Sequence, residues 1–424
     1  MIARGRYSGM ITSNSKYDAK FYKSINLVII FLLFLGAFNG LVLMVNSASQ
    51  GTGSAPLSPV SNSTSEVWSQ FDGNACHTGY IGSIGPTTNN IVWSDNIQGS
   101  RDGLIVINNI LYVSKPDSGG ITAINGLNGS TLFSAYVNGV SGTSYPAYGE
   151  GLIFAENYEV GFFRTTVDLV ADNAYNGGQV WSISITPAPA ESAYYSYGLV
   201  TYYDGYVFEV PYQLNQITSY VAGTGSTDWT DHTNFSITTI PTVGDGLVVV
   251  AGGNKVSAIN ISSGITQWSL NITGNITSTP SYSSGTFFLG TSSGYLYAIS
   301  VAGTVLWKVN LGFPIEDTAS LANGFIYVGT DGGNIYELTQ SRGNIMWTYS
   351  VQGAVIASPV VSSNGIVYVG STNGIIYALN ATNGKPVWEK NLGASITANP
   401  VLVNVALFGT YLRLNSFLVS PTSR

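Results

Sequence analysis

Cysteine, histidine and charged residues are scarce in this chain. Among 424 residues there is one cysteine, Cys76, and there are two histidines. A single cysteine excludes an intrachain disulfide and a metal site built from several thiolates. Charged residues make up 9% of the chain, against about a quarter in an average protein. With a net charge of −7 and no basic stripe, the composition argues against nucleic-acid binding.

Long apolar runs are also rare, and the one present lies near the N-terminus, from Ile25 to Val45. It follows a basic segment, residues 1–24. About 20 apolar residues can cross a bilayer as a helix, and basic residues before such a helix stay in the cytoplasm. The sequence therefore predicts a signal-anchor helix at 25–45, which would place a single-pass protein in the cell membrane with its C-terminal domain outside. A cleaved signal peptide is the alternative, because small residues follow at Ser47–Ser49; the protein would then be secreted.

Residues 46–65 form a Ser-, Gly- and Pro-rich stretch without an apolar period, which is typical of a flexible linker. The folded domain is predicted to span residues 66–424. Sequons of the N-x-S/T type fit an exported domain and mark candidate N-glycosylation sites. They begin at Asn62, Asn128, Asn234, Asn260, Asn271, Asn275 and Asn380.

Aromatic residues recur at a nearly constant interval along this domain. Trp229 and Trp388 delimit a run of five tryptophans that lie 39 to 41 residues apart. In the clearest repeat, residues 364–388, two alternating apolar runs flank a glycine turn, and a second glycine turn precedes the tryptophan strand. Such a period predicts four short antiparallel strands per unit, the pattern of a propeller blade. The aromatic positions predicted to pack between blades are Trp93, Phe133, Trp181, Trp229, Trp268, Trp307, Trp347 and Trp388.

The two ends of the domain complement each other. After Trp388 the sequence holds three further strand patterns, within residues 396–419, but no strand with a tryptophan. An unpaired strand pattern of that kind lies near the start, at Ile91–Ile97. Pairing the two closes the ring and removes its exposed edge. The sequence thus predicts an all-β, eight-bladed propeller whose last blade is closed by an N-terminal strand. Seven blades is the alternative, if the units around Trp181 are misread.

These motifs resemble the pyrroloquinoline-quinone-like (PQQ-like) propeller repeat family. Val367–Trp388 is similar to its blade signature, and Trp68–Gly79 is similar to the opening of exported members. The resemblance implies that the glycines and tryptophans pack blades together. It also implies a structural hydrogen-bonding role for His77, within the opening motif.

The family includes quinone-dependent dehydrogenases, so the resemblance raises the question of an enzyme. The alcohol dehydrogenase branch carries adjacent cysteines beside the quinone, which Cys76 alone cannot supply. The sugar dehydrogenase branch uses histidine and basic residues around the quinone, and both are sparse here. We therefore expect no catalytic residue, no bound cofactor and no metal site. A quinone-dependent oxidoreductase is the alternative.

The repeat spacing stretches to 48 residues on both sides of Trp181, which indicates insertions in two units. Charged residues and tyrosines gather there, and such groups are typical of sugar- or protein-binding surfaces. Packing of the tyrosines between blades is the competing interpretation. The candidate binding patch comprises Glu156, Glu159, Arg164, Asp168, Tyr194, Tyr195, Tyr197, Tyr202 and Tyr203.

The function expected from the sequence is that of a non-catalytic binding or scaffold protein at the cell surface or envelope. Its expected partner is an envelope protein or a surface glycan, with the membrane contacted through the N-terminal helix. An envelope-protein assembly factor is a further alternative, because a bacterial lipoprotein with that role shares the repeat. Against it, no lipidation cysteine follows the apolar run, since Cys76 lies far beyond Val45.

Overall fold

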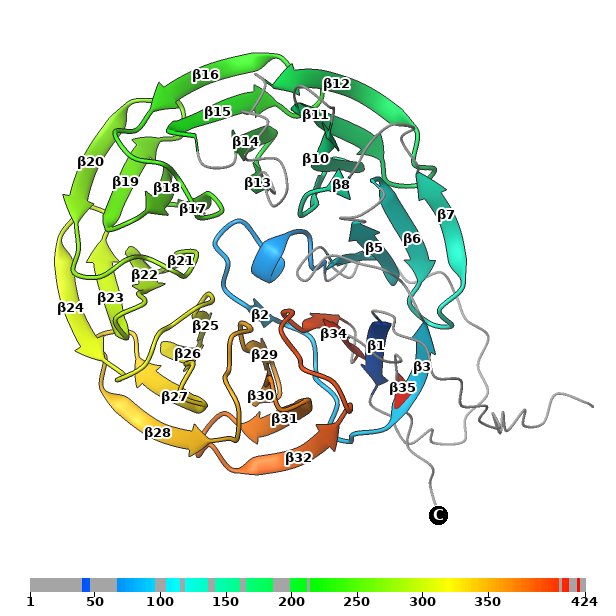
Figure 1. Cartoon of the computed structure of the whole chain (residues 1–424), viewed down its shortest axis with the longest axis vertical. Helices are drawn as coiled ribbons and strands as arrows, with labels where there is room; N and C mark the ends of the chain where they lie inside the picture. Colours follow the sequence, from blue (N-terminus) through cyan, green and yellow to red (C-terminus); the bar gives the residue numbers. More distant parts are fainter. Residues whose placement is uncertain are drawn as a thin grey trace, which may run out of the picture. The chain divides into compact units, whose positions relative to one another are not determined.

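The computed structural model describes residues 40–45, 67–95, 104–114, 119–135, 142–160, 165–185, 199–211, 214–403, 406–411 and 418–419. All of these belong to one compact unit, Ala37–Arg424. Within this unit the strands form eight sheets arranged in a ring (Figure 1). Seven of the sheets consist mainly of strands consecutive in the chain, and the remaining one joins strands from both ends. We call the first kind blades 1 to 7 and the last the closing sheet.

The blades are antiparallel and, in most cases, four-stranded. Blade 1 comprises β4 (Leu104–Ile107), β5 (Ile110–Ser114), β6 (Ile121–Asn125) and β7 (Thr131–Ala135). Blade 2 comprises β8 (Gly142–Thr143), β9 (Ala147–Gly149), β10 (Leu152–Val160), β11 (Thr165–Asn173) and β12 (Gln179–Ile185). Blade 3 comprises β13 (Leu199–Tyr203), β14 (Tyr206–Val210), β15 (Gln216–Val221) and β16 (Thr227–His232). Blade 4 comprises β17 (Thr242–Gly244), β18 (Leu247–Gly252), β19 (Lys255–Asn260) and β20 (Thr266–Asn271).

The same order continues through the rest of the ring. Blade 5 comprises β21 (Ser281–Ser283), β22 (Thr286–Gly290), β23 (Tyr295–Ser300) and β24 (Val305–Asn310). Blade 6 comprises β25 (Ser320–Ala322), β26 (Phe325–Gly329), β27 (Asn334–Thr339) and β28 (Ile345–Ser350). Blade 7 comprises β29 (Val360–Ser362), β30 (Ile366–Gly370), β31 (Ile375–Asn380) and β32 (Pro386–Asn391), with β2 (Tyr80–Ile81) added parallel to β29.

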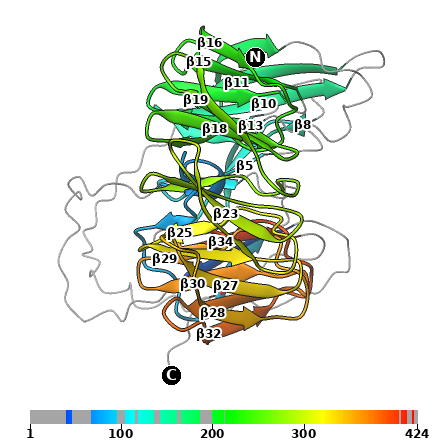
Figure 2. The same cartoon turned by 90° about the vertical axis from the view of Figure 1, so that its left-hand side faces the viewer.

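Burial along the strands explains the repeat pattern. The second and third strands of a blade are buried on both sides, as in β26 and β27, because neighbouring blades cover both faces. The fourth strand alternates between exposed and half-buried residues, as in β28, because its outer side faces solvent. The side view shows the strands running between the two faces of the ring (Figure 2). The predicted all-β propeller with four-stranded antiparallel blades is therefore confirmed.

The closing sheet joins the two ends of the domain. It contains β33 (Val401–Val403), β34 (Ala406–Tyr411), β1 (Gly40–Val45), β3 (Ile91–Asp95) and β35 (Leu418–Val419). The predicted contribution of the Trp93 strand is confirmed, because β3 belongs to this sheet. The structure supports the alternative count of seven blades built from consecutive strands. The eighth unit that the sequence predicted is the closing sheet, which combines strands from both ends of the domain.

One strand of this sheet comes from an unexpected part of the sequence. β1 pairs antiparallel with all of β34, in the place expected for residues 411–419. The prediction of a helix over 25–45 is therefore wrong for its last six residues, which form β1. An unbroken apolar run satisfies a buried strand as well as a membrane helix, so hydropathy could not separate the two. Among the described residues, no helix has the length and apolar character to cross a membrane. Residues 1–24, 25–39 and 46–65 lie outside the described residues.

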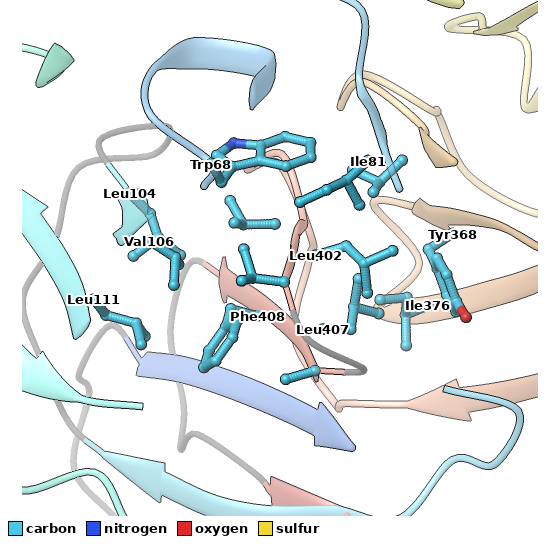
Figure 3. Packing of buried hydrophobic residues seen from close by; sticks show 14 of the residues in the cluster. Trp68, Ile81, Leu104, Val106, Leu111, Tyr368, Ile376, Leu402, Leu407 and Phe408 are labelled. Carbon is cyan, nitrogen blue, oxygen red and sulfur yellow. The ribbon is translucent and has the colours of Figure 1, made fainter. Parts of the chain in front are cut away.

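The hydrophobic core of the closing sheet lies between blades 1 and 7. Leu402, Leu407 and Phe408 come from β33 and β34 and are buried. Figure 3 shows them between Leu104, Val106 and Leu111 on one side and Ile81, Tyr368 and Ile376 on the other, with Trp68 packed above. The sheet thus buries apolar side chains against both neighbours and completes the ring.

The tryptophans of the fourth strands join neighbouring blades. The indole Nε1 of Trp268 donates to the Val301 carbonyl of the next blade (2.8 Å), and Trp307 donates in the same way to Gln340 (2.9 Å). A glycine of the next blade lies against each indole: a Cβ built on Gly303 would come 2.7 Å from Trp268. The predicted role of these tryptophans in packing between blades is borne out by these contacts.

Gly303→Ala should lower the free energy of unfolding by about 1–3 kcal/mol more than Gly285→Ala does, because only the first methyl overpacks against an indole. The two glycines have nearly equal positive φ angles, 76° and 78°, but nothing lies within 4 Å of a Cβ at Gly285. Both variants carry the strain of alanine at positive φ, so their difference isolates the contact. Denaturant unfolding measures it; equal losses would contradict a packing role for this glycine.

Candidate functional site

The opening segment, residues 67–81, lies inside the ring, where η1 (Phe71–Gly73) and β2 are drawn in blue near the centre of Figure 1. Its backbone carbonyls accept hydrogen bonds from N–H groups on the innermost strands of successive blades. The pairs, carbonyl first, are Ser69 with Tyr148, Ala75 with Val243, Cys76 with Tyr282, Thr78 with Leu321 and Gly79 with Val361. The partners belong to blades 2, 4, 5, 6 and 7, so residues 67–81, which we call the axial segment, are bound to most of the ring.

The remaining sheets hold the axial segment through other groups. Trp68 exchanges two backbone hydrogen bonds with Val106 of blade 1, both 2.9 Å. The side-chain amide of Gln70 forms two hydrogen bonds with the backbone of blade 3. Its Nε2 donates to the Tyr202 carbonyl (3.1 Å), and its Oε1 accepts from the Tyr202 N–H (2.9 Å). The buried Asp72 carboxylate accepts from the amide of Asn399, just before the closing sheet. Every sheet therefore contacts the segment.

His77 lies in this segment and is completely buried. Its Nδ1 is 2.9 Å from the Phe71 carbonyl oxygen, and its Nε2 is 3.0 Å from the Pro241 carbonyl oxygen. Burial lowers the pKa of His77, whereas the two carbonyl contacts act in the opposite direction. Both ring nitrogens thus lie within hydrogen-bond distance of backbone oxygens. This arrangement is the structural one that the opening motif predicted.

The polar side chains of the axial segment named above, Gln70, Asp72 and His77, are thus engaged with the chain itself. Burial, followed by the charge of Asp245, raises the pKa of the Cys76 thiol, which disfavours the reactive thiolate. Among the described residues, no three His, Cys, Asp or Glu side chains come together as a metal-binding group. The axial segment lies near the axis and is hydrogen-bonded there to the surrounding blades.

The structure places four members of the candidate binding patch in different surroundings. Glu156 is buried between blades 2 and 3. Asp168 accepts a hydrogen bond from Ser184 Oγ on the neighbouring strand (2.6 Å). Tyr202 stacks on Phe154 with ring centroids 5.7 Å apart, and Tyr203 is 42% exposed. The structure does not bring these four together in one surface. Arg164, Tyr194, Tyr195, Tyr197 and the side chain of Glu159 lie outside the described residues.

The predicted insertion in blade 2 corresponds to its long central hairpin. β10 and β11 have nine residues each, whereas the matching strands of the other blades have five or six. Because the strands of a blade alternate in direction, their ends fall on two opposite faces. The end of β10 at Val160 and the end of β12 at Ile185 lie on one face. The turns Glu150–Gly151 and Asp204–Gly205 lie on the other, which we call the turn face.

Sequons occur at both faces. Asn128, Asn260 and Asn380 lie at the turn face, and of these Asn128 is exposed while the other two are half-buried. Asn234, Asn271 and Asn275 lie towards the opposite face and are exposed. Asn62 is outside the described residues. The described sequons thus lie on both faces, whereas modification itself stays a prediction.

Tyr202 and Tyr203 belong to a different cluster from the one predicted. On the turn face of blades 2 and 3, five tyrosines lie in or next to turns, two of which carry exposed carboxylates; we call this set the tyrosine surface. Its members are Tyr148, Tyr175, Tyr202, Tyr203, Tyr206, Glu150 and Asp204. Tyr175 is 68% exposed, Tyr203 42% and Tyr206 38%, and both carboxylates are exposed.

Hydrogen bonds fix the inner part of the tyrosine surface. The phenol of Tyr202 accepts from the Gly205 N–H (3.1 Å) and bonds to Glu150 of the neighbouring blade. Burial raises the pKa of Tyr202, and the nearby Glu150 and Asp204 carboxylates add to the shift. Burial also raises the pKa of Tyr148, whose phenol is hydrogen-bonded to that of Tyr175. The phenols of Tyr148 and Tyr202 therefore stay neutral at physiological pH.

The tyrosine surface lies in a part of the ring whose described residues carry no positive side chain. The described residues of blades 2 and 3 contain no lysine or arginine. The tyrosine surface accordingly offers exposed aromatic rings, neutral hydroxyls and two carboxylate acceptors without a cation. Sequence reasoning missed Tyr148, Tyr175, Glu150 and Asp204. The available signal was position, because Tyr148, Tyr202 and Tyr282 occupy the same place before the first turn of their blades.

Comparison with known proteins agrees with this architecture. A PQQ-type family model, described as outer membrane protein assembly factor BamB, matches residues 165–320 and 296–410. No curated protein matches the chain significantly. BamB from Moraxella catarrhalis is similar at a TM-score of 0.58 and 16% identity, over 76% of this chain and 96% of that one.

Further similar structures include a quinohemoprotein alcohol dehydrogenase from Comamonas testosteroni, with a TM-score of 0.62 and 13% identity over 85% of this chain and 81% of that one. The computationally designed Ika8 protein has a TM-score of 0.60 and 15% identity over 74% of this chain and 98% of that one. These likenesses concern the fold. The family match covers more than half of the chain, so the protein belongs to the PQQ-like, BamB-type family of β-propeller repeat proteins.

Proposed function

We propose that this propeller is a non-catalytic binding protein of the cell surface or envelope, and that the tyrosine surface binds an uncharged glycan. The observation that carries the non-catalytic part is the occupied axis. The axial segment lies near the axis and is hydrogen-bonded to all seven blades and to Asn399 before the closing sheet, so a quinone there would have to displace the protein's own chain. An enzyme built on such a ring needs that space for cofactor and substrate.

The chemistry of the tyrosine surface supports the choice of ligand. Exposed aromatic rings such as Tyr203 and Tyr206 can stack on the apolar face of a sugar ring. The carboxylates of Glu150 and Asp204 can accept hydrogen bonds from sugar hydroxyls. An anionic glycan is disfavoured, because the carboxylates repel it and the described residues of blades 2 and 3 supply no cation.

The double variant Tyr203→Ser/Tyr206→Ser should bind uncharged oligosaccharides about tenfold or more weakly, since the loss of two stacking rings removes roughly 1.5 kcal/mol or more. Both side chains are partly exposed, so folding should be retained. Binding to an oligosaccharide array, followed by titration calorimetry, gives the measurement. Phe313→Ser is the matched control, because Phe313 is 49% exposed outside the tyrosine surface.

Two outcomes would contradict the proposal. Unchanged glycan binding by the double variant would remove the tyrosine surface as the site. A rise in melting temperature with pyrroloquinoline quinone and Ca²⁺ would favour the oxidoreductase, because a ligand that binds only the folded state must stabilise it.

A further inference from the structure

Two buried glutamates face each other between blades 2 and 3. Glu209 on β14 is completely buried, and Glu156 on β10 is 3% exposed. No other blade has an acid at either place. At the place of Glu209, the second strands of the other blades carry Val113, Ala155, Val250, Leu289, Val328 and Val369. At the place of Glu156 they carry Ser114, Val210, Ala251, Gly290, Gly329 and Gly370.

The register of the strands sets the direction of both side chains. Residues two apart on a strand share a side, so Glu156 points the same way as Phe154, and Glu209 the same way as Val207. Phe154 and Val207 belong to the one hydrophobic cluster between blades 2 and 3. The two carboxyl groups therefore meet within an apolar interface, close enough to hydrogen-bond to each other.

Within the part of the chain that the structure describes, no hydrogen-bond donor stabilises a charge on Glu209. Among the described residues, neither of its carboxyl oxygens accepts a hydrogen bond from a backbone N–H, a hydroxyl or a cation. Two ionised carboxylates cannot hydrogen-bond to each other, because neither carries a hydrogen. They would also repel strongly at such a short distance in an apolar interior. A proton on one of them removes the repulsion and creates the hydrogen bond.

We infer that Glu156 and Glu209 form a proton-binding site that links blades 2 and 3: the pair holds one shared proton at neutral pH and loses it in alkaline solution. Losing the proton places two negative charges in the interface and weakens the contact between the blades. The inference does not depend on the proposed glycan site, and it concerns the only acid pair that the described structure buries between two blades.

The other titratable groups of the interface are consistent with this arrangement. Burial raises the pKa of Glu209 well above its ordinary value, and the Glu156 carboxyl adds to the shift. Tyr220 on β15 faces the same cluster; burial and the nearby Glu209 raise its pKa to about 12, so it stays neutral. Tyr158 lies two residues beyond Glu156 on the same side of β10. Asp168 on β11 lies opposite Asn157 in the strand register, and its side chain therefore points away from Glu156.

The sign of the pH dependence follows from linkage. A carboxyl whose pKa is higher in the folded than in the unfolded protein makes the folded state bind more protons between the two values. Stability from this site is complete below the unfolded glutamate pKa, about 4.3, and is lost as pH rises through the folded pKa. Within that window the folding equilibrium constant should fall about tenfold per pH unit for one retained proton.

The test compares pH-dependent unfolding of the whole protein with that of Glu209→Gln, whose neutral amide can donate to the Glu156 carboxylate. The glutamine variant should lack the tenfold-per-unit fall and should be more stable than the unmodified protein in alkaline solution. Asp228→Asn is the control, because Asp228 is an exposed acid on the outer strand of the same blade. If Glu209→Gln fails to fold, Glu209→Leu is the second variant, because blade 5 has a leucine, Leu289, at the equivalent position. It should also lack the tenfold fall of the folding equilibrium constant per pH unit.

Infrared difference spectroscopy supplies an independent readout. At neutral pH the protein should show a protonated-carboxyl C=O band that is absent from the Glu156→Gln/Glu209→Gln double variant. The inference is overturned if that band is missing from the unmodified protein, or if Glu209→Gln retains the full pH slope. Stabilisation by Ca²⁺ alone at neutral pH, lost in Glu209→Gln, would also overturn it by showing that a cation takes the place of the proton.

Discussion

Trp388→Ala should lower the free energy of unfolding by about 3–5 kcal/mol, the usual cost of truncating a buried aromatic side chain. Trp388 is 8% exposed and lies 5.8 Å from the ring of Tyr368. Its indole Nε1 donates to the Pro86 carbonyl (3.0 Å), and the Tyr368 hydroxyl donates to the same oxygen (2.9 Å). Other tryptophans bond to the next blade, whereas Trp388 bonds to the segment that precedes β3. Its loss should therefore loosen the junction between blade 7 and the N-terminal part of the domain.

Denaturant unfolding combined with limited proteolysis measures both effects. Trp268→Ala is the control, because Trp268 joins two blades that are consecutive in the chain. Both variants should be destabilised, but only Trp388→Ala should become sensitive to protease within residues 83–90. Equal protease resistance of the two variants would show that Trp388 has no special role in closure.

His77→Ala should lower the free energy of unfolding by about 2–4 kcal/mol, because it removes a buried ring and its contact with the Phe71 carbonyl oxygen, whereas the Pro241 carbonyl oxygen still accepts a hydrogen bond from Thr201. The lost contacts are those to Phe71 and Pro241, which tie the axial segment to blade 4. The side chain is also packed edge-on against Phe71, with ring centroids 5.6 Å apart. The variant should thus be weakened at the centre of the ring.

The same substitution should remove part of the acid sensitivity of the fold. Burial makes the folded pKa of His77 lower than the unfolded value of about 6.5. The unfolded state then binds more protons between the two values, so stability falls as pH drops below about 6.5. His232→Ala is the matched control, because His232 is exposed and is the only other histidine. Unfolding curves between pH 8 and 5 that have the same pH dependence in all three proteins would contradict this assignment.

The blades could be predicted from the sequence because each is built from local hairpins. Two glycine turns, alternating apolar residues and one tryptophan strand fall within about 40 residues, as in residues 364–388. The presence of β3 in the closing sheet could also be anticipated. The C-terminal end had three strand patterns but no tryptophan strand, and the N-terminal end had one such strand without partners. Both predictions use only the sequence repeat and the rule that an exposed strand edge needs a partner. Neither requires knowledge of side-chain contacts between distant residues.

The axial segment, the tyrosine surface and β1 depend on distant contacts, and the sequence could not place them. Nothing in the sequence near Gln70 indicates that its side-chain amide forms two hydrogen bonds with the backbone of Tyr202. Neighbouring tyrosines on β13 alternate in direction, so Tyr202 packs inward while Tyr203 is exposed, although the sequence pattern treats them alike. Glu156 was a reasonable candidate for a surface patch, because composition cannot show that it meets Glu209 in the interior.

The axial segment has a consequence for the order of folding. Asp72 and Asn399, which hydrogen-bond at 3.1 Å, are separated by 327 residues along the chain. Contacts of such high sequence separation form slowly, because the entropy of closing the loop must be overcome before they stabilise anything. A nascent chain emerges from the ribosome with the axial segment before all seven blades and with its last partner, Asn399, near the end. The ring should consequently gain its full cooperativity only after synthesis is complete, when the earliest residues of the domain are enclosed by the latest.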